Sequence, residues 1–138
     1  MFGFLKRLFG TKAERNIKRL KPYVKKINTL YATLAKLSHD ELRAETDKLR
    51  AFLASKTDTI TQEITALQTQ VADTGELREK LKLNEKISQL EEKQARITER
   101  ALHEMLPQAF AIVKETARRF KENTTITVKA NDFDKKIA

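Results

Sequence analysis

The sequence has no cysteine, and only three glycines and two prolines occur among its 138 residues. The absence of cysteine excludes disulfide bonds, thiolate nucleophiles and cysteine-ligated zinc, and it agrees with a reducing compartment. So few glycines and prolines favour long helices over the turn-rich chain of a β-sandwich or barrel, and they leave no glycine-rich loop to cradle a phosphate. Because 40% of the residues are apolar, the chain can still bury a modest core. We therefore predict an all-α fold.

The first ten residues, MFGFLKRLFG, combine five large apolar side chains with one Lys-Arg pair. In a helix the apolar residues share one side and the basic pair points away. A helix of ten residues is about 15 Å long, roughly half the thickness of a hydrocarbon core, so it cannot span a membrane. The stretch also lacks the uninterrupted apolar run and the cleavage site of a secretory signal. We expect residues 1–12 to form an amphipathic helix of a cytoplasmic protein.

The formal net charge of +9 is concentrated near the N-terminus. Residues 1–36 hold ten Lys/Arg against Glu14 alone, whereas the charges of the other 102 residues balance. Such a segment favours binding to a polyanionic surface, either a nucleic-acid backbone or acidic phospholipid headgroups, although a solvated helix face explains the charge equally well. The candidate membrane- or partner-binding residues are Phe2, Phe4, Leu5, Lys6, Arg7, Leu8, Phe9, Lys12, Arg15, Lys18 and Arg19.

Residues 13–56 predict a basic helix followed by a second, capped helix. Apolar side chains at 13, 17, 20, 24, 27, 31 and 34 repeat with the 4-3 spacing of a helix that packs against another helix. Pro22 should kink or restart this helix, because proline lacks the N–H that the ladder needs. Ser38 and Glu41 match an S-x-x-E capping box. The second helix should end near residue 54 and face the first through Leu42, Leu49, Phe52 and Leu53.

The remaining residues divide into a polar stretch and an apolar one. In residues 57–104, two weakly apolar 4-3 seams flank the turn signal Asp73-Thr74-Gly75, which predicts an antiparallel helical hairpin that projects from the body. Residues 105–138 begin with MLPQAFAIVKETARRF, in which Pro107 suits the first turn of a core helix. Its expected core face consists of Leu106, Phe110, Val113, Ala117 and Phe120. The alternating β-branched residues at 124–128 are a candidate for a short C-terminal strand.

Catalytic and metal-binding patterns are missing from the sequence. It contains no P-loop, Rossmann fingerprint or H-E-x-x-H motif. His39 and His103 are each expected to be structural, because a metal ligand needs partners. Ser38-His39-Asp40 is not a catalytic triad, since neighbours on one helical turn point in different directions. We predict no catalytic, metal or cofactor-binding residue in this chain.

Three stretches taken together resemble the N-terminus of SecA, the ATPase motor of bacterial preprotein translocation. They are MFGFLKRLFGTKAERNIKRLKPYVKKIN, LAKLSHDELRAETDKLRAFLA and MLPQAFAIVKETARRF. In that family an amphipathic start leads into a basic helix, a capped helix follows, and the third stretch opens the first nucleotide-binding domain. Two departures stand out. Residues 57–104 replace a short connection and look like an insertion, and the Walker A loop that the family pattern places soon after Phe120 is not reached.

The resemblance implies the N-terminal fragment of a longer protein-translocating ATPase, with ATP and magnesium bound elsewhere in the parent protein. It implies a cytoplasmic protein that is peripheral on the inner face of the cell membrane. The implied partners are anionic phospholipid, the SecYEG channel, the ribosome, preproteins bound through the parent, and a second copy in a homodimer. Two alternatives stay open on the residues alone: a basic helical module that binds nucleic acid, and a stand-alone coiled-coil interaction protein. The first ten residues could also fold back on the body.

Overall fold

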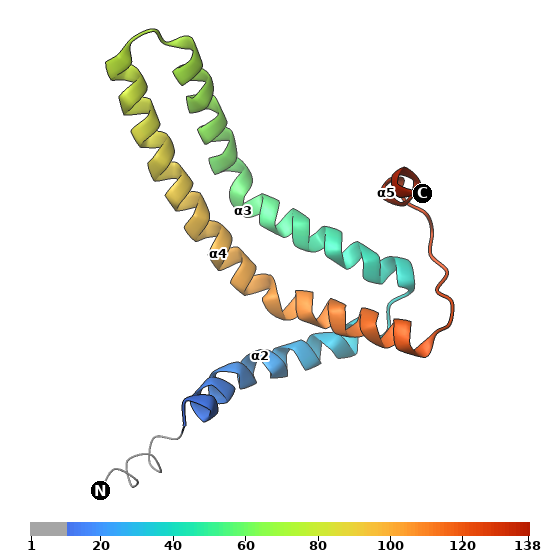
Figure 1. Cartoon of the computed structure of the whole chain (residues 1–138). Helices are drawn as coiled ribbons and strands as arrows, with labels where there is room; N and C mark the ends of the chain where they lie inside the picture. The colour runs from blue at the N-terminus through green and yellow to red at the C-terminus, as the bar shows by residue number, and fades with distance from the viewer. Residues whose placement is uncertain (1–10) are drawn as a thin grey trace, which may run out of the picture. The chain divides into compact units, whose positions relative to one another are not determined.

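The computed structural model describes residues 11–138, and this part of the chain consists of helices and connecting segments without a strand. The helices are α2 (Lys12–Leu34), α3 (His39–Asp73), α4 (Leu77–Glu122) and α5 (Asp132–Ile137), as labelled in Figure 1. The predicted all-α class is confirmed. The described chain divides into two compact units: unit 1 contains residues 11–43 and 107–138, and unit 2 contains residues 44–106.

Capping boxes begin three of the helices. At α2 the Glu14 N–H donates to the Thr11 hydroxyl at 3.2 Å, and the Glu14 carboxylate accepts from the Thr11 N–H. At α3 the predicted pair is present, because the Ser38 N–H donates to the Glu41 carboxylate at 2.7 Å and the Glu41 N–H donates to the Ser38 hydroxyl at 3.2 Å. Asn131 caps the short helix α5 in the same way. Each box satisfies two backbone donors that the first helical turn leaves without a partner.

Helices α3 and α4 are longer than the sequence pattern predicted. The second helix was expected to end near residue 54, but α3 continues to Asp73, and neither glycine nor proline interrupts it. Pro107 was expected in the first turn of a new helix, but it lies inside α4, which begins at Leu77. Pro22 likewise lies inside α2, which is not restarted there. A proline removes one ladder hydrogen bond, and the many bonds on either side hold these helices together.

Unit 2 is an antiparallel pair of helical arms joined by residues 74–76, at the green-to-yellow turn in Figure 1. Ile60 and Ile64 of α3 pack with Ile87 of α4 to form its buried centre. The partly buried residues around this centre are Leu67, Val71, Leu90 and Ile97. One polar bond also crosses the pair, from the Gln94 amide to the Thr61 hydroxyl at 2.7 Å. A thin apolar seam therefore holds the arms together, while their outer faces carry polar and charged side chains.

Unit 1 buries Leu34, Leu42, Ala111 and Ile112 together with two charged residues of α4, Glu115 and Arg119. The expected core face of α4 is instead exposed: Leu106, Phe110, Val113, Ala117 and Phe120 are all classed as exposed. The predicted residues do share one apolar face of α4, but α2 and the start of α3 cover a different face of this helix, the one that carries Ala111, Ile112, Glu115 and Arg119. Leu49, Phe52 and Leu53 belong to unit 2 rather than to the unit that contains α2.

The C-terminal segment contains no strand. Residues 123–131 have no regular secondary structure, and the described chain offers no partner strand for the β-branched residues 124–128. The segment is attached to the start of α3 instead. Arg43 binds the Asp134 carboxylate at 2.6 and 2.8 Å and the Lys129 carbonyl oxygen at 3.2 Å, and the Lys129 N–H donates to the Asp40 carboxylate at 3.0 Å. The hydrogen bond from Arg43, aided by that from the Asn131 backbone, lowers the pKa of Asp134.

Candidate docking surface on the basic helix

Helix α2 has an exposed first half and a packed second half. Every residue from 12 to 22 is exposed in the described chain. Further along, the side chains of Tyr23, Ile27, Leu30 and Tyr31 are partly buried, and Leu34 is fully buried. The first half of α2 is therefore held by its capping box and by the continuous helix, rather than by side-chain packing.

The packed half of α2 is fixed to α4 by Lys114. Its ammonium group donates to the Asn28 amide oxygen at 2.8 Å and lies 4.3 Å from the centre of the Tyr31 ring. A cation over an aromatic face is attracted by the ring quadrupole, by about 0.5–1 kcal/mol at exposed sites. These two contacts link the second half of α2 to α4 within unit 1.

Arg119 fastens the end of α2 and the start of α3 to α4. One of its terminal nitrogens donates to the Leu37 carbonyl oxygen at 2.6 Å and to the Leu34 carbonyl oxygen at 3.4 Å. The other lies 3.0 Å from Nδ1 of His39. Because a guanidinium has no acceptor atom, this ring nitrogen must be the acceptor. His39 therefore has a structural role, as the sequence suggested.

Glu115 supplies the opposite charge for this arginine. Its side chain is 0% exposed, and it accepts from Nε of Arg119 at 2.8 Å and from two nitrogens of Arg118 at 2.7 and 3.0 Å. The hydrogen bond from Arg118, followed by that from Arg119, outweighs burial and lowers the pKa of Glu115 to about 2. The same pairing raises the pKa of Arg118. Because buried charges are stable only when paired and hydrogen-bonded, these residues hold unit 1 in one arrangement.

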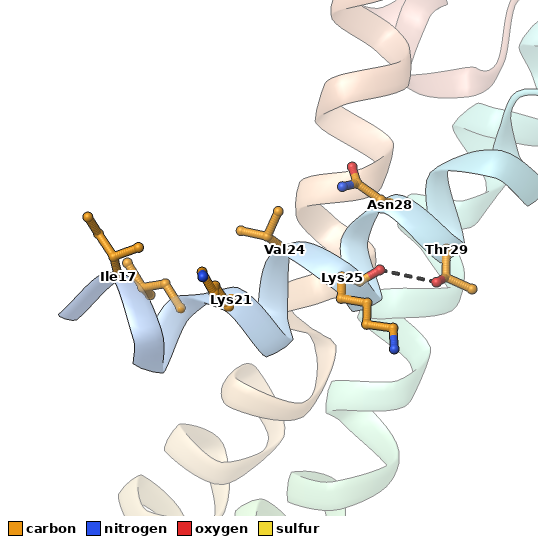
Figure 2. Close-up of a pocket in the computed structure, with 7 residues that line it drawn as sticks. Ile17, Lys21, Val24, Lys25, Asn28 and Thr29 are labelled. Carbon is orange, nitrogen blue, oxygen red and sulfur yellow. Dashed lines mark hydrogen bonds between the residues drawn. The ribbon is translucent and has the colours of Figure 1, made fainter. Parts of the chain in front are cut away.

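Helix α2 presents an exposed apolar stripe, which we define as Ile17 and Leu20 of its first half and Val24 just beyond it. These side chains are 57%, 58% and 52% exposed, respectively. Together with Lys21, Lys25, Asn28 and Thr29 they line a hollow of about 760 Å³. Figure 2 shows Ile17 and Val24 on the same side of the helix, with the Lys25 ammonium pointing away from them. Because one helix supplies all seven residues, the hollow is an open surface rather than an enclosed pocket.

Basic side chains lie mainly on the side of α2 that is opposite the apolar stripe. Seven Lys/Arg lie on this helix, namely Lys12, Arg15, Lys18, Arg19, Lys21, Lys25 and Lys26, whereas Glu14 is its one acidic residue. The Glu14 carboxylate is engaged in the capping box. Among the described residues, Lys18, Arg19, Lys25 and Lys26 form no ion pair with an acidic side chain. At about 100° per residue, Lys18 lies opposite Leu20. The surface is therefore amphipathic and strongly basic.

The structure brings together the four predicted site residues that it describes. Lys12, Arg15, Lys18 and Arg19 all lie on the exposed half of α2. The other seven predicted residues, Phe2, Phe4, Leu5, Lys6, Arg7, Leu8 and Phe9, lie outside the described residues. Sequence reasoning missed Ile17, Leu20 and Val24 as surface residues, because their 4-3 spacing was assigned to helix packing. It also missed Lys21 and Lys25 as candidate site residues. Both lie far in sequence from any acidic residue, which could have indicated that their charges are unpaired.

Comparison of the sequence with known proteins identifies the family of this chain. The family model described as the SecA DEAD-like domain matches residues 5–132. The chain belongs to the SecA family. It is 43% identical over 135 residues to a protein translocase subunit SecA of Phocaeicola vulgatus, and the match covers 98% of this chain and 12% of that protein. It is 42% identical over 140 residues to the SecA of Amoebophilus asiaticus, covering 100% of this chain and 12% of that protein.

The SecA relatives are much longer than this chain, which spans about an eighth of their length. Their matches include residues 57–104, so these relatives align with the hairpin region as well as with the flanking helices. No solved structure gives a significant match. Within residues 11–138, no helix is both long enough and apolar enough to cross a bilayer. The same residues contain no cluster of histidine and acidic side chains that could hold a metal ion.

Proposed function

We propose that this chain is the N-terminal docking segment of a SecA-type protein translocase, and that the exposed half of α2, together with residues 1–10, binds the anionic surface of a membrane. The observation that carries the proposal is the combination of the exposed apolar stripe with a basic arc, Lys18, Arg19, Lys25 and Lys26, whose side chains form no ion pair with an acidic side chain within residues 11–138. An amphipathic helix of this kind lies in the interface plane, with its apolar stripe among the acyl chains and its cations at the headgroups.

The two contributions are similar in size. Complete burial of one large aliphatic side chain contributes about 1.5–3 kcal/mol, and each basic residue near an anionic leaflet contributes about 1 kcal/mol. Three half-exposed side chains and several lysines therefore give reversible binding rather than permanent insertion. Because Thr11 and Glu14 already cap α2, this helix avoids part of the ordering cost that an unfolded peptide would bear.

The wider assignment follows from the family. In the longer protein this segment would sit at the inner face of the cell membrane and bring the motor to the SecYEG channel, with the ribosome and preproteins as further partners. ATP and magnesium would bind in the parent protein beyond these residues. We further propose that residues 57–104 are an inserted hairpin whose removal leaves unit 1 intact.

Vesicle flotation tests the docking proposal. The chain should float with vesicles that contain phosphatidylglycerol, and binding should decrease as salt screens the charges. Replacing Lys18 and Arg19 by glutamate should reduce binding strongly. The matched control replaces Lys86 and Lys93, two exposed lysines of the hairpin, by glutamate, so that the change in net charge is the same, and binding should not change. Equal binding to neutral and anionic vesicles, or an unchanged K18E/R19E variant, would show that the basic arc of α2 is not the docking surface. Binding to RNA that exceeds binding to vesicles would favour the nucleic-acid alternative.

A further inference from the structure

The hairpin carries a second row of helical residues beside the seam that joins its arms, and we call it the second row of α4. Its three leucines, Leu77, Leu81 and Leu102, are 71%, 62% and 47% exposed. At about 100° per residue, the row lies about 110° around α4 from the buried seam of Leu83 and Ile87. The residues of the row, spaced 4-3-4-3-4-3-4, are Leu77, Leu81, Asn84, Ser88, Glu91, Ala95, Thr98 and Leu102.

This row differs in charge from the other side of the same helix. It contains one charged residue, Glu91, in eight positions. On the other side of the seam, a row with equivalent spacing has six charged residues in seven positions, namely Glu79, Lys82, Lys86, Gln89, Lys93, Arg96 and Arg100. A solvated helix face has the charged composition, whereas few charges together with exposed leucines are typical of a contact surface.

The adjacent arm of α3 is also uncharged where it borders the second row. The Gln94 amide of α4 donates to the Thr61 hydroxyl at 2.7 Å. The hydroxyls of Thr61 and Thr65 each donate to the carbonyl oxygen four residues earlier at 2.9 Å, so their hydrogen-bond donors are used within α3. Because 4-3 spacing is that of helices packed through interlocking side chains, the second row fits an α-helix.

We propose that the second row of α4 binds an α-helix of a partner protein, and that this helix carries a lysine or arginine opposite Glu91. Glu91 is exposed and forms no ion pair within residues 11–138. As the one charge of the row, Glu91 selects a cation, because like charges facing each other across an interface are strongly unfavourable. Asn84 adds to the selection, since a polar residue within such a row fixes the register of the two helices.

Two other occupants fit the second row less well. A second copy that docked through the same row would bring another Glu91 and no cation to the contact. An anionic membrane would repel Glu91, and the row supplies no cation for the headgroups. The proposal therefore concerns a surface distinct from α2, and it does not depend on membrane docking.

Two synthetic helical peptides probe the charge selection in the full 138-residue chain without vesicles. Both have leucine and alanine in a 4-3 row, and the central position of the row is lysine in one peptide and glutamate in the other. By fluorescence anisotropy, the lysine peptide should bind at least about tenfold more tightly, and Glu91→Lys should reverse this preference. Leu77→Gln combined with Leu81→Gln should weaken binding about tenfold. The matched control, Lys86→Gln with Lys93→Gln on the charged row, should change it less than about twofold.

Site-specific cross-linking in cells tests the natural occupant. With photoreactive benzoylphenylalanine in place of Leu81, the full product of the reading frame should cross-link to a helical segment that has a 4-3 row and a basic residue, and Glu91→Lys should remove the product. The same group in place of Lys86 should give no such product. Equal binding of the two peptides, or cross-links at position 81 that are absent or lead to a second copy or to lipid, would overturn the proposal.

Discussion

The replacement of Arg119 by alanine should destabilise unit 1 more than any replacement of an exposed arginine. Arg119 is 6% exposed and binds the carbonyl oxygens of Leu34 and Leu37, His39 and Glu115. Breaking a buried ion pair by removing one partner costs about 3–5 kcal/mol. Glu115 would keep its bonds to Arg118, so we expect the lower end of this range, about 3 kcal/mol. That is a large share of the stability of a small domain, about 5–15 kcal/mol.

The assay uses the two tyrosines of the sequence, Tyr23 and Tyr31, which both lie on α2 and therefore report on unit 1. Urea unfolding followed by tyrosine fluorescence should show the loss of about 3 kcal/mol in Arg119→Ala. Arg19→Ala is the matched control, because Arg19 also lies in unit 1, is exposed and forms no ion pair with a described acidic side chain, and it should change the free energy of unfolding by at most about 0.5 kcal/mol. Equal free energies of unfolding for the two variants would refute the structural role assigned to Arg119.

Further outcomes follow from the same contacts. The pKa of the Glu115 carboxyl is lowered from 4.5 to about 2. The contribution of this carboxylate to stability is therefore present above pH 4.5 and is lost as the pH falls toward 2. In Glu115→Gln, the free energy of unfolding should depend less on pH between these two values. Ile64→Ala and Ile87→Ala should each lower the free energy of unfolding of unit 2 by about 2–4 kcal/mol. Circular dichroism at 222 nm should show this loss, while the midpoint of the tyrosine signal stays the same. A shift of both signals together would contradict independent unfolding of the two units. Joining Ser55 to Glu104 through a short linker should leave the tyrosine transition in place, and its loss would refute the insertion proposal. Asp134→Asn should make residues 123–131 more sensitive to protease, because Arg43 loses the nearer of its two acidic partners and keeps only Asp40 at 3.9 Å; unchanged cleavage would show that the pair of Arg43 and Asp134 does not hold the segment.

The sequence predicted those features that depend on neighbouring residues. The helical class follows from apolar periodicity together with few glycines and prolines. The capping box of Ser38 and Glu41 and the turn at residues 74–76 are likewise encoded within a few positions. The extent of α3 and α4 was less predictable, because a 4-3 seam looks the same whether two stretches share one helix or belong to two.

The features that were missed depend on contacts between distant segments. Glu115 and Arg119 look in sequence like an ordinary solvated pair one helical turn apart, because the carbonyl groups that Arg119 binds lie more than 80 positions away. Apolar spacing likewise predicts that Ile17, Leu20 and Val24 share a face, but it cannot say what covers that face. The same limit applies to Phe110, Val113 and Phe120.

The most direct test of the docking proposal measures the environment of single sites on α2. The chain contains no cysteine, so Leu20→Cys and Lys18→Cys each provide one attachment point for the environment-sensitive dye NBD. Residue 20 lies on the apolar stripe, and residue 18 lies on the opposite side of the helix. On addition of phosphatidylglycerol vesicles, the dye at position 20 should shift its emission to shorter wavelength, and the dye at position 18 should not. No shift at position 20, or equal shifts at both positions, would contradict the proposal that α2 docks through its apolar stripe.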